Sequence, residues 1–73
     1  MDVHKRVRSI RESKGLNQIY LSSKIGLSNT SYSMKETGKR PFTIEELYKL
    51  SRVLDVPIAH FFEDEFHEKC NVI

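Results

Sequence analysis

The sequence predicts an all-α fold made of five short helices in one domain. Apolar residues recur every three or four positions in each segment, the spacing of one helix face, and no stretch alternates apolar and polar residues as a strand does. Glycine, proline and capping residues separate the segments. With 73 residues, of which 38% are hydrophobic and 30% charged, the chain has the size and composition of a folded domain with one modest core.

The first two predicted helices each end at a glycine. The first runs over about residues 2–14, and Gly15 follows it; the second begins after Asn17 and runs to Gly26. Asn17 is positioned to cap the second helix, and the glycines supply the left-handed or tight backbone that ends a helix. The apolar faces of these two helices consist of Val3, Val7, Ile10, Leu21 and Ile25.

The third and fourth predicted helices begin at hydroxyl side chains. Ser28 is positioned to cap a third helix that continues to about Thr37 and ends at Gly38. Thr43 begins the fourth helix with a capping box, because Glu46 stands three residues later and can accept a hydrogen bond from the Thr43 amide. The apolar face of the fourth helix consists of Ile44, Leu47, Leu50 and Leu54.

A fifth helix is predicted to begin at Pro57, whose missing amide hydrogen is tolerated in a first turn. Its apolar face consists of Ile58, Phe61, Phe62 and Phe66, and it continues through an acidic stretch to about Lys69. We therefore expect a domain over residues 1–62 and an acidic C-terminal extension over residues 63–73 that continues this helix.

Charge is distributed unevenly along the chain. Residues 1–41 carry nine Lys or Arg and three Asp or Glu, a net charge of +6, whereas residues 42–73 carry three and seven, a net charge of −4. The basic part contains the second and third predicted helices, and such a pair of short helices joined by a glycine turn can insert one helix into a DNA major groove. The charge pattern therefore favours a polyanionic partner over a simply solvated surface.

Several classes of function are excluded by what the sequence lacks. It has no phosphate-binding glycine loop, no paired-cysteine motif and no nucleophile turn, so we predict neither enzyme activity nor a cofactor. His67 and Cys70 have a spacing that could hold zinc, with His60 on the same side, but surface residues on a tail are the better interpretation and no metal site is predicted. Cys70, as the lone cysteine, forms no internal disulfide. No apolar run approaches the roughly 18 residues of a membrane span, and residues 1–10 are too charged for a signal peptide, so we expect a cytoplasmic protein.

Four segments together resemble a known family: KRVRSIRESKGLNQ near the start, LSSKIGLS in the middle, ETGKR after the third helix, and VLDVPIAHFF at the end. Over about residues 3–62 the chain is similar to the lambda-repressor-like, XRE-type helix-turn-helix proteins, which bind DNA as transcriptional regulators. Ile19, Tyr20, Ser22 and Lys35 depart from the residue types usual in that family, which weakens any transfer of base specificity.

The resemblance assigns roles to individual residues. It implies that Asn17 and Gln18 approach a phosphate or an adjacent base, that Lys39 and Arg40 contact phosphate, and that the groove-facing part of the third helix consists of Asn29, Thr30, Ser31, Ser33 and Met34. Lys35 is expected to lay its methylenes along the core and to direct its ammonium to solvent or phosphate. Asn29 is the strongest candidate for reading adenine, because its amide both donates and accepts. For Thr30, Ser31 and Ser33, capping the helix or facing water is an equally good interpretation.

The resemblance also implies a charged pair, Arg11 with Glu36, that ties the first helix to the third. Such a pair would orient the third helix even where its net contribution to stability is near zero.

We expect a homodimer on a palindromic operator, because one small module buries little surface on DNA. Candidate dimer residues are Phe62, Phe66, Val72 and Ile73, although Phe62 and Phe66 could equally belong to the core. The favoured function is a sequence-specific transcriptional regulator, with repression preferred. The alternative is an interaction module that does not read DNA, such as an antirepressor or antitoxin partner, with Ile19 and Tyr20 as its interface. The operator, any protein effector, and the choice between a phage or mobile-element regulator and a restriction-modification controller stay open.

Overall fold

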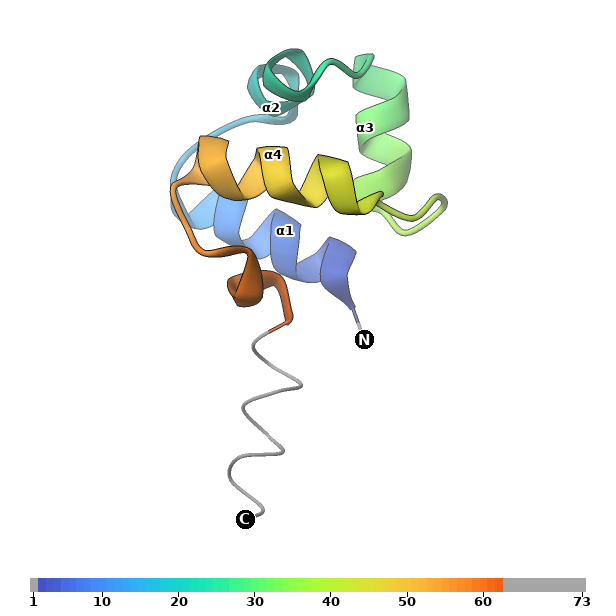
Figure 1. The fold of residues 1–73 in the computed structure, drawn as a ribbon. Coiled ribbons are helices and arrows are strands. Elements are labelled where there is room, and N and C mark those ends of the chain that lie inside the picture. Colours follow the sequence, from blue (N-terminus) through green and yellow to red (C-terminus); the bar gives the residue numbers. More distant parts are fainter. Residues whose placement is uncertain (1, 63–73) are drawn as a thin grey trace.

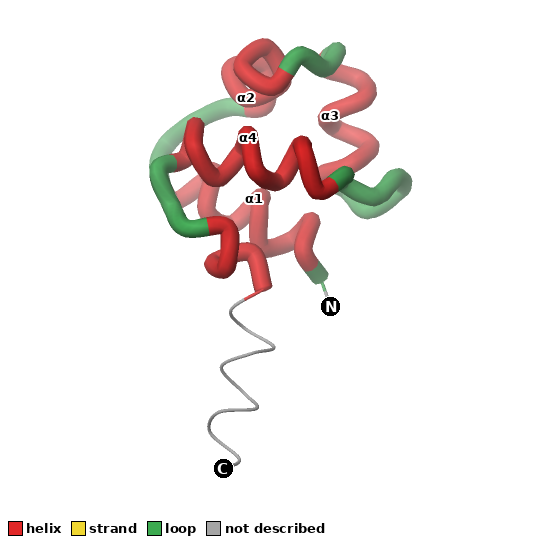
Figure 2. Tube along the Cα trace, in the orientation of Figure 1, coloured by secondary structure: helices red, strands yellow, loops and turns green. Residues whose placement is uncertain are grey.

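The computed structural model of the chain describes residues 2–62, and these form helices joined by short loops, with no strand among them (Figures 1 and 2). The elements are α1 (Val3–Ser13), α2 (Gln18–Ile25), α3 (Asn29–Glu36), α4 (Ile44–Leu54) and the short 3-10 helix η1 (Ile58–Phe62). In the view of Figure 1, α4 crosses in front of α1, with α2 above it and α3 to its right. The all-α prediction is confirmed for this part of the chain.

The predicted boundaries of the second, third and fourth helices are confirmed by the backbone to within one or two residues. Asn17 accepts a hydrogen bond from the amide of Tyr20 and so caps α2, which ends at Gly26 with φ of 78°. The Thr43 hydroxyl accepts from the amide of Glu46 while the Glu46 carboxylate accepts from the amide of Thr43, which completes the capping box. These ends are set by local side-chain chemistry, which is why the sequence predicts them well.

The core gathers one face of every helix. Its buried residues are Val7, Ile10, Leu21, Ile25, Tyr32, Leu47, Leu50, Leu54 and Phe61. No helix of eight to eleven residues is stable alone in water, so this shared burial is what holds α2 and α3 at a fixed angle. Tyr32 lies in the core with its ring 5.9 Å from that of Phe42, centroid to centroid.

The prediction that Ile44 belongs to the buried face of the fourth helix is wrong. Ile44 is 73% exposed, whereas Leu47, Leu50 and Leu54 are buried as expected. With about 100° of rotation per residue, the three leucines fall within an arc of about 60°, and Ile44 lies a further 60° or so beyond Leu47. Its position at the first turn of α4 carries it away from the core.

The expected fifth α-helix is also not found in the described residues. Residues 58–62 form a 3-10 helix, in which the His60 amide donates to the Pro57 carbonyl at 2.9 Å. With about three residues per turn, this geometry stacks Ile58 and Phe61 on one side, toward the core. The Nε of Arg6 on α1 donates to the His60 carbonyl at 2.9 Å and fastens the turn. The predicted continuation through Phe66 to Lys69 lies outside the described residues.

Candidate nucleic-acid interface

The turn between α2 and α3 is built by a short sequence of local interactions. Gly26 adopts the left-handed conformation, and the Leu27 amide then donates back to the Ser22 carbonyl at 2.9 Å. Ser28 follows in an extended conformation and accepts from the Ser31 amide, so α3 begins at once. The two helices are consequently joined by three residues, with the amino end of α3 at the surface beside the carboxyl end of α2 (Figure 1).

The predicted groove-facing residues share the outer side of α3. Asn29 and Thr30 are exposed, and Ser31, Ser33 and Met34 are partly exposed. Because Ser28 supplies the cap, Ser31 is left with a free hydroxyl, and within residues 2–62 the hydroxyls of Thr30 and Ser33 have no hydrogen-bond partner either. This side of α3 therefore presents several polar groups that are available to a ligand.

Asn29 is exposed and at the same time held in place. Its Oδ1 lies 2.6 Å from the Ser22 hydroxyl on α2, and that hydroxyl lies 2.9 Å from the Ile19 carbonyl. An amide side chain carries two N–H donors and two oxygen lone pairs, so one contact with Ser22 leaves both a donor and an acceptor on Asn29. Ser22 thus orients the Asn29 amide and leaves it with hydrogen-bonding groups for a ligand. This role for Ser22 was not predicted from the sequence.

Glu36 is the centre of a buried polar network behind α3. Its carboxylate accepts from Arg11 Nε and NH2 at 2.9 Å each, from Tyr32 Oη at 2.6 Å and from Gln18 Nε2 at 2.9 Å. The guanidinium also donates to the Leu16 carbonyl at 2.7 Å. The predicted Arg11–Glu36 pair is therefore formed, in the bidentate geometry that fixes both position and angle. It ties α1 and α2 to the last turn of α3.

The network shifts the pKa values of its members. Burial raises the pKa of the Glu36 carboxyl, but the hydrogen bonds from Arg11, Tyr32 and Gln18 and the Arg11 charge outweigh it, so the pKa falls below its ordinary value. Burial and the hydrogen bond to Glu36 raise the pKa of Tyr32. The hydrogen bond to Glu36 raises that of Arg11. At neutral pH the pair is therefore fully charged and Tyr32 is neutral.

Three residues predicted to contact DNA have partners inside the protein. Asn17 uses its side-chain oxygen to cap α2. Gln18 donates one N–H to Glu36. Lys35 places its Nζ 2.6 Å from both carboxylate oxygens of Glu46, with both side chains largely buried. The methylenes of Lys35 do pack inward as expected, but the ammonium connects α3 to α4.

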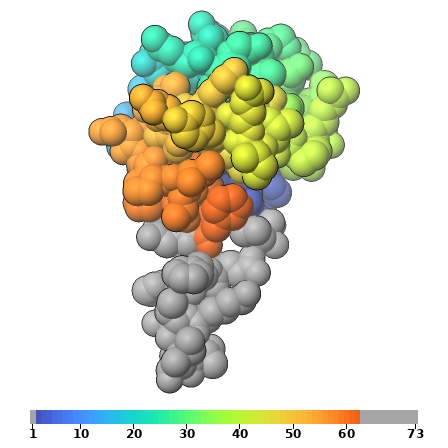
Figure 3. All heavy atoms as spheres, in the orientation of Figure 1, coloured from blue at the N-terminus to red at the C-terminus, as the bar shows by residue number. Residues whose placement is uncertain are grey.

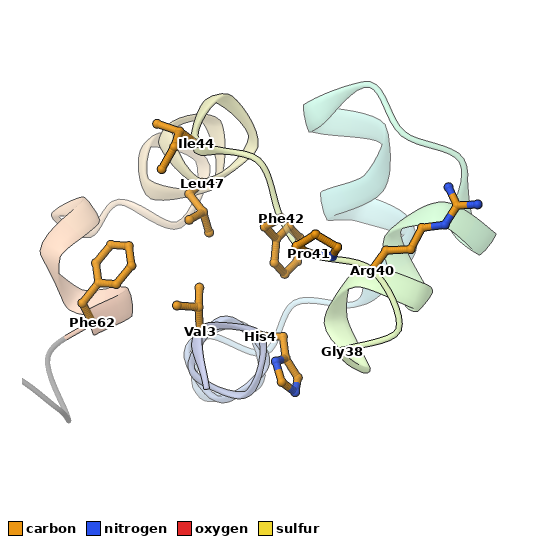
Figure 4. A pocket seen from close by; sticks show the side chains of 9 residues that line it. All are labelled: Val3, His4, Gly38, Arg40, Pro41, Phe42, Ile44, Leu47 and Phe62. Atoms are coloured by element: carbon orange, nitrogen blue, oxygen red, sulfur yellow. The ribbon is translucent and has the colours of Figure 1, made fainter. Parts of the chain in front are cut away.

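The loop after α3 carries exposed cations. Lys39 and Arg40 are exposed, and neither is paired with another residue in the part of the chain that the structure describes. Arg40 borders a cavity of about 430 Å³ lined mainly by apolar side chains of α1, α4 and η1, but its guanidinium points away from it (Figure 4). Gly38 precedes the loop with φ of 87°, directly beside His4. The two cations are thus free to meet a polyanion next to α3.

Other predicted features fall outside the interface or outside the described residues. Phe62 is partly buried against the core, whereas Phe66, Val72, Ile73, His67 and Cys70 lie beyond residue 62. Within residues 2–62 there is no cluster of three or more potential metal ligands. None of the helices there has the length and apolar character that crossing a membrane requires.

Comparison with known proteins gives consistent matches. A family model described as "Helix-turn-helix" matches residues 7–61. A chain from Rhodospirillum rubrum named "Uncharacterized transcriptional regulator in ATPase CF(0) region" is 35% identical over 66 residues, which cover 88% of this chain and 61% of that one. The "Uncharacterized HTH-type transcriptional regulator YqaE" of Bacillus subtilis (strain 168) is 29% identical over 63 residues, or 86% and 54% of the two chains. A protein of Sinorhizobium medicae named "Uncharacterized HTH-type transcriptional regulator" is 30% identical over 88% of this chain and 48% of its own. The chain thus spans about half to three fifths of the length of these relatives.

Proposed function

The chain belongs to the lambda-repressor-like helix-turn-helix family of DNA-binding transcriptional regulators, and we propose that it is a cytoplasmic repressor that binds a palindromic operator as a homodimer. The observation that carries the proposal is the outer side of α3, where exposed or partly exposed polar side chains have unused donors and acceptors, while Glu36 fixes the helix from the core side. Repression is preferred because it requires only occupancy of the operator.

Base reading is assigned to α3. Asn29, oriented by Ser22, keeps a donor and an acceptor that match the N6 and N7 positions of adenine in the major groove. The side chains of Thr30, Ser31 and Ser33 are short, so their hydroxyls reach base edges or phosphates only when α3 lies deep in the groove. Met34 suits a contact with a thymine methyl group.

Phosphate binding is assigned to Lys39 and Arg40, and also to the free amide hydrogens at the amino end of α3. These contacts set the affinity for any duplex and make it salt-dependent, whereas Asn29 sets the preference among sequences. Lys35 is not assigned a direct role, because Glu46 neutralises its ammonium.

Two copies are proposed because a single module of this size buries too little surface on DNA for tight specific binding. Two-fold symmetry would place the two α3 helices in successive major grooves about 34 Å apart, so the operator would be a palindrome with that spacing.

The test begins with selection of bound sequences from a random DNA pool, which yields the operator and its symmetry. Asn29→Ala is then expected to lower the affinity for the selected operator by about 1–3 kcal/mol and to relax the preference at one base pair. Lys39→Ala is expected to weaken binding to all sequences alike and to reduce the slope of log affinity against log salt by about 1.

Ser9→Ala, at an exposed position on α1, is the matched control and should leave both measurements unchanged. Urea unfolding of each variant separates loss of binding from loss of the fold. Recovery of no enriched sequence from the pool, or unchanged discrimination by Asn29→Ala, would contradict the proposed reading.

A second candidate function is an interaction module that does not read DNA. It is favoured by Tyr20, which is 42% exposed on α2 with Lys24 Nζ 5.4 Å from its ring centre, and by the neighbouring exposed Ile19. A salt titration with random DNA distinguishes the two candidates: a DNA regulator binds with a steep salt dependence, and an interaction module hardly binds at all.

A further inference from the structure

The Ser22 hydroxyl on α2 lies between two acceptors and can donate one hydrogen. Its Oγ is 2.6 Å from Oδ1 of Asn29 and 2.9 Å from the carbonyl oxygen of Ile19. The residue is only 1% exposed, so water does not compete for the hydroxyl. The Ile19 carbonyl lies in the first turn of α2, where the helix backbone supplies its own N–H donor. The hydroxyl hydrogen is therefore available to Asn29.

The short distance identifies which end of the Asn29 amide faces Ser22. A contact of 2.6 Å is ordinary for O–H···O but shorter than the usual range for N–H···O, which begins at about 2.7 Å. The amide oxygen therefore faces the buried hydroxyl, and Nδ2 is directed away from it. The asparagine side chain has no such preference of its own, because its last torsion is broad and roughly two-fold.

This contact lies where α2 and α3 meet at the surface. Asn29 is the first residue of α3, and Ser22 stands in the middle of α2. In the space-filling view the atoms of the two helices, teal to green, adjoin along the top of the molecule (Figure 3). Ser22 also departs from the residue type usual in the family, so the family resemblance does not supply this hydroxyl contact.

We propose that Ser22 is a positioning residue for base specificity, because its hydroxyl fixes which end of the Asn29 amide donates to a base and which end accepts. The proposal rests on the proposed function, in which α3 reads DNA, and adds the residue that selects between base pairs. Reading adenine requires one order across the major groove: Nδ2 donates to N7, and the remaining lone pair of Oδ1 accepts from N6. A C·G pair presents a donor and an acceptor in the reverse order, N4 of cytosine and then O6 of guanine.

The size of the effect follows from the contact that is lost when the amide turns over. Turning replaces the short contact from Ser22 with a longer one from Nδ2, and it returns the hydroxyl hydrogen to a carbonyl that already has a donor. This costs part of one neutral hydrogen bond, which corresponds to about a two- to fivefold change in an equilibrium. An amide without Ser22 turns freely, and then about half of its population still matches adenine.

Binding to two matched operators tests the specificity. The first is the selected operator, and the second carries C·G in place of A·T at the pair where Asn29→Ala relaxes the preference. Ser22→Ala is expected to lower the ratio of the two affinities about two- to fivefold. The affinity for the A·T operator should fall by less than about twofold while that for the C·G operator rises, which a merely loosened fold would not produce.

Ser51→Ala is the matched control. Ser51 is 7% exposed on α4 and donates to the Tyr48 carbonyl, three residues before it, at 2.6 Å. The variant therefore removes a buried helix hydroxyl of the same kind without altering Asn29, and it should leave the affinity ratio unchanged. Alanine is the best helix former, so both serine variants are expected to fold, and urea unfolding verifies this.

Two measurements test whether Ser22 acts through the Asn29 amide. The double variant Ser22→Ala/Asn29→Ala should have the same affinity ratio as Asn29→Ala alone. In the free chain, NMR relaxation of the Asn29 Nδ2 group should show more ps–ns motion in Ser22→Ala than in the wild-type chain or in Ser51→Ala. A further change of the ratio in the double variant, or equal motion in all three chains, would overturn the proposal.

The outcomes separate this proposal from the proposed function. An operator whose A·T to C·G ratio is unchanged in Ser22→Ala, or whose two forms lose affinity alike, overturns the role of Ser22 and leaves DNA reading by α3 intact. Recovery of no enriched sequence, or of no base pair at which Asn29→Ala relaxes the preference, contradicts the proposed function, and the specificity role of Ser22 fails with it.

Discussion

Replacing Glu36 by glutamine tests how strongly the fold depends on the buried network behind α3. Glu36 is 2% exposed and is the only negative charge within hydrogen-bond distance of the buried Arg11 guanidinium among the described residues, apart from an exposed contact to Glu12 at 3.8 Å. Glutamine has nearly the same shape but no charge and a single acceptor oxygen. The variant leaves the buried Arg11 with only the longer contact to the exposed Glu12 carboxylate, and it gives Tyr32 and Gln18 a poorer acceptor.

The expected loss follows from the behaviour of broken buried pairs. Removing one partner of a buried ion pair costs about 3–5 kcal/mol, because the other charge stays desolvated. A domain of this size has a total stability on the order of 5 kcal/mol. Glu36→Gln is therefore expected to be partly or largely unfolded at 25 °C.

Urea unfolding followed by circular dichroism measures the change. The control Glu12→Gln removes an exposed carboxylate that lies 3.3 Å from Arg8, and it should shift the free energy of unfolding by less than about 0.5 kcal/mol. The double variant Arg11→Met/Glu36→Leu removes both charges together and should be more stable than Glu36→Gln. A loss below about 1 kcal/mol for Glu36→Gln would refute the reasoning.

The pH dependence gives an independent measurement of the same network. The pKa of Glu36 is lower in the folded chain than in the unfolded one, so the unfolded chain binds more protons in acid. The stability from this carboxylate is fully present above the unfolded pKa of about 4.3 and is lost as pH falls through the lower, folded pKa. Glu46, whose pKa is lowered by Lys35 and Thr43 against the opposing effect of burial, adds a loss of the same sign. Glu36→Gln should therefore flatten, but not abolish, the fall in stability below about pH 5.

Two further predictions concern the loop and the fourth helix. Gly38→Ala would place a Cβ 2.7 Å from His4 Nε2 at φ of 87° and is expected to cost about 1–3 kcal/mol in thermal unfolding. Gly15→Ala, at φ of 72° with nothing within 4 Å, carries the backbone strain alone and should cost less, and the difference should disappear when His4 is also changed to alanine. Thr43→Ala removes the cap of α4 and should lower the free energy of unfolding by about 1 kcal/mol in urea. Equal losses for the two glycine variants, or an unchanged midpoint for Thr43→Ala, would count against these readings.

Helix ends and the central ion pair could be predicted from the sequence because each depends on few residues. Asn17 and Thr43 cap their helices through neighbours three residues away, and the sequence contains the whole interaction. The Arg11–Glu36 pair was implied by family resemblance, since the residues are 25 positions apart and no local pattern joins them. The i, i+4 spacing of Tyr32 and Glu36 is the one local signal in the sequence for the contact between the tyrosine hydroxyl and the carboxylate.

The partners of Gln18 and Lys35 could not be predicted, because they depend on how the helices are placed in space. Both side chains are polar and lie near the predicted DNA surface along the sequence, yet each finds a carboxylate on another helix. A buried carboxylate is costly unless it is paired with a cation and hydrogen-bonded. Donors close to it in space therefore bind it within the protein and are not left for a ligand. The prediction of a DNA contact is therefore strongest for exposed side chains, such as Thr30, whose hydroxyl has no acceptor within hydrogen-bond distance among residues 2–62.

The same competition explains why the polar groups of α3 that bond to the protein's own core network lie toward its carboxyl end, while the exposed ones lie at its amino end. Glu36, Tyr32 and Lys35 are bound inside the protein and set the position of the helix, while Asn29 and Thr30 at its amino end remain exposed. Tyr32→Phe removes the hydrogen bond from the Tyr32 hydroxyl to Glu36 and keeps every exposed polar group of α3. We expect α3 to be held less rigidly in this variant. It should lower the affinity for the operator through α3 mobility while leaving binding to random DNA, which depends on Lys39 and Arg40, nearly unchanged. Equal loss on both kinds of DNA would mean that the buried network maintains the fold as a whole and does not specifically orient α3.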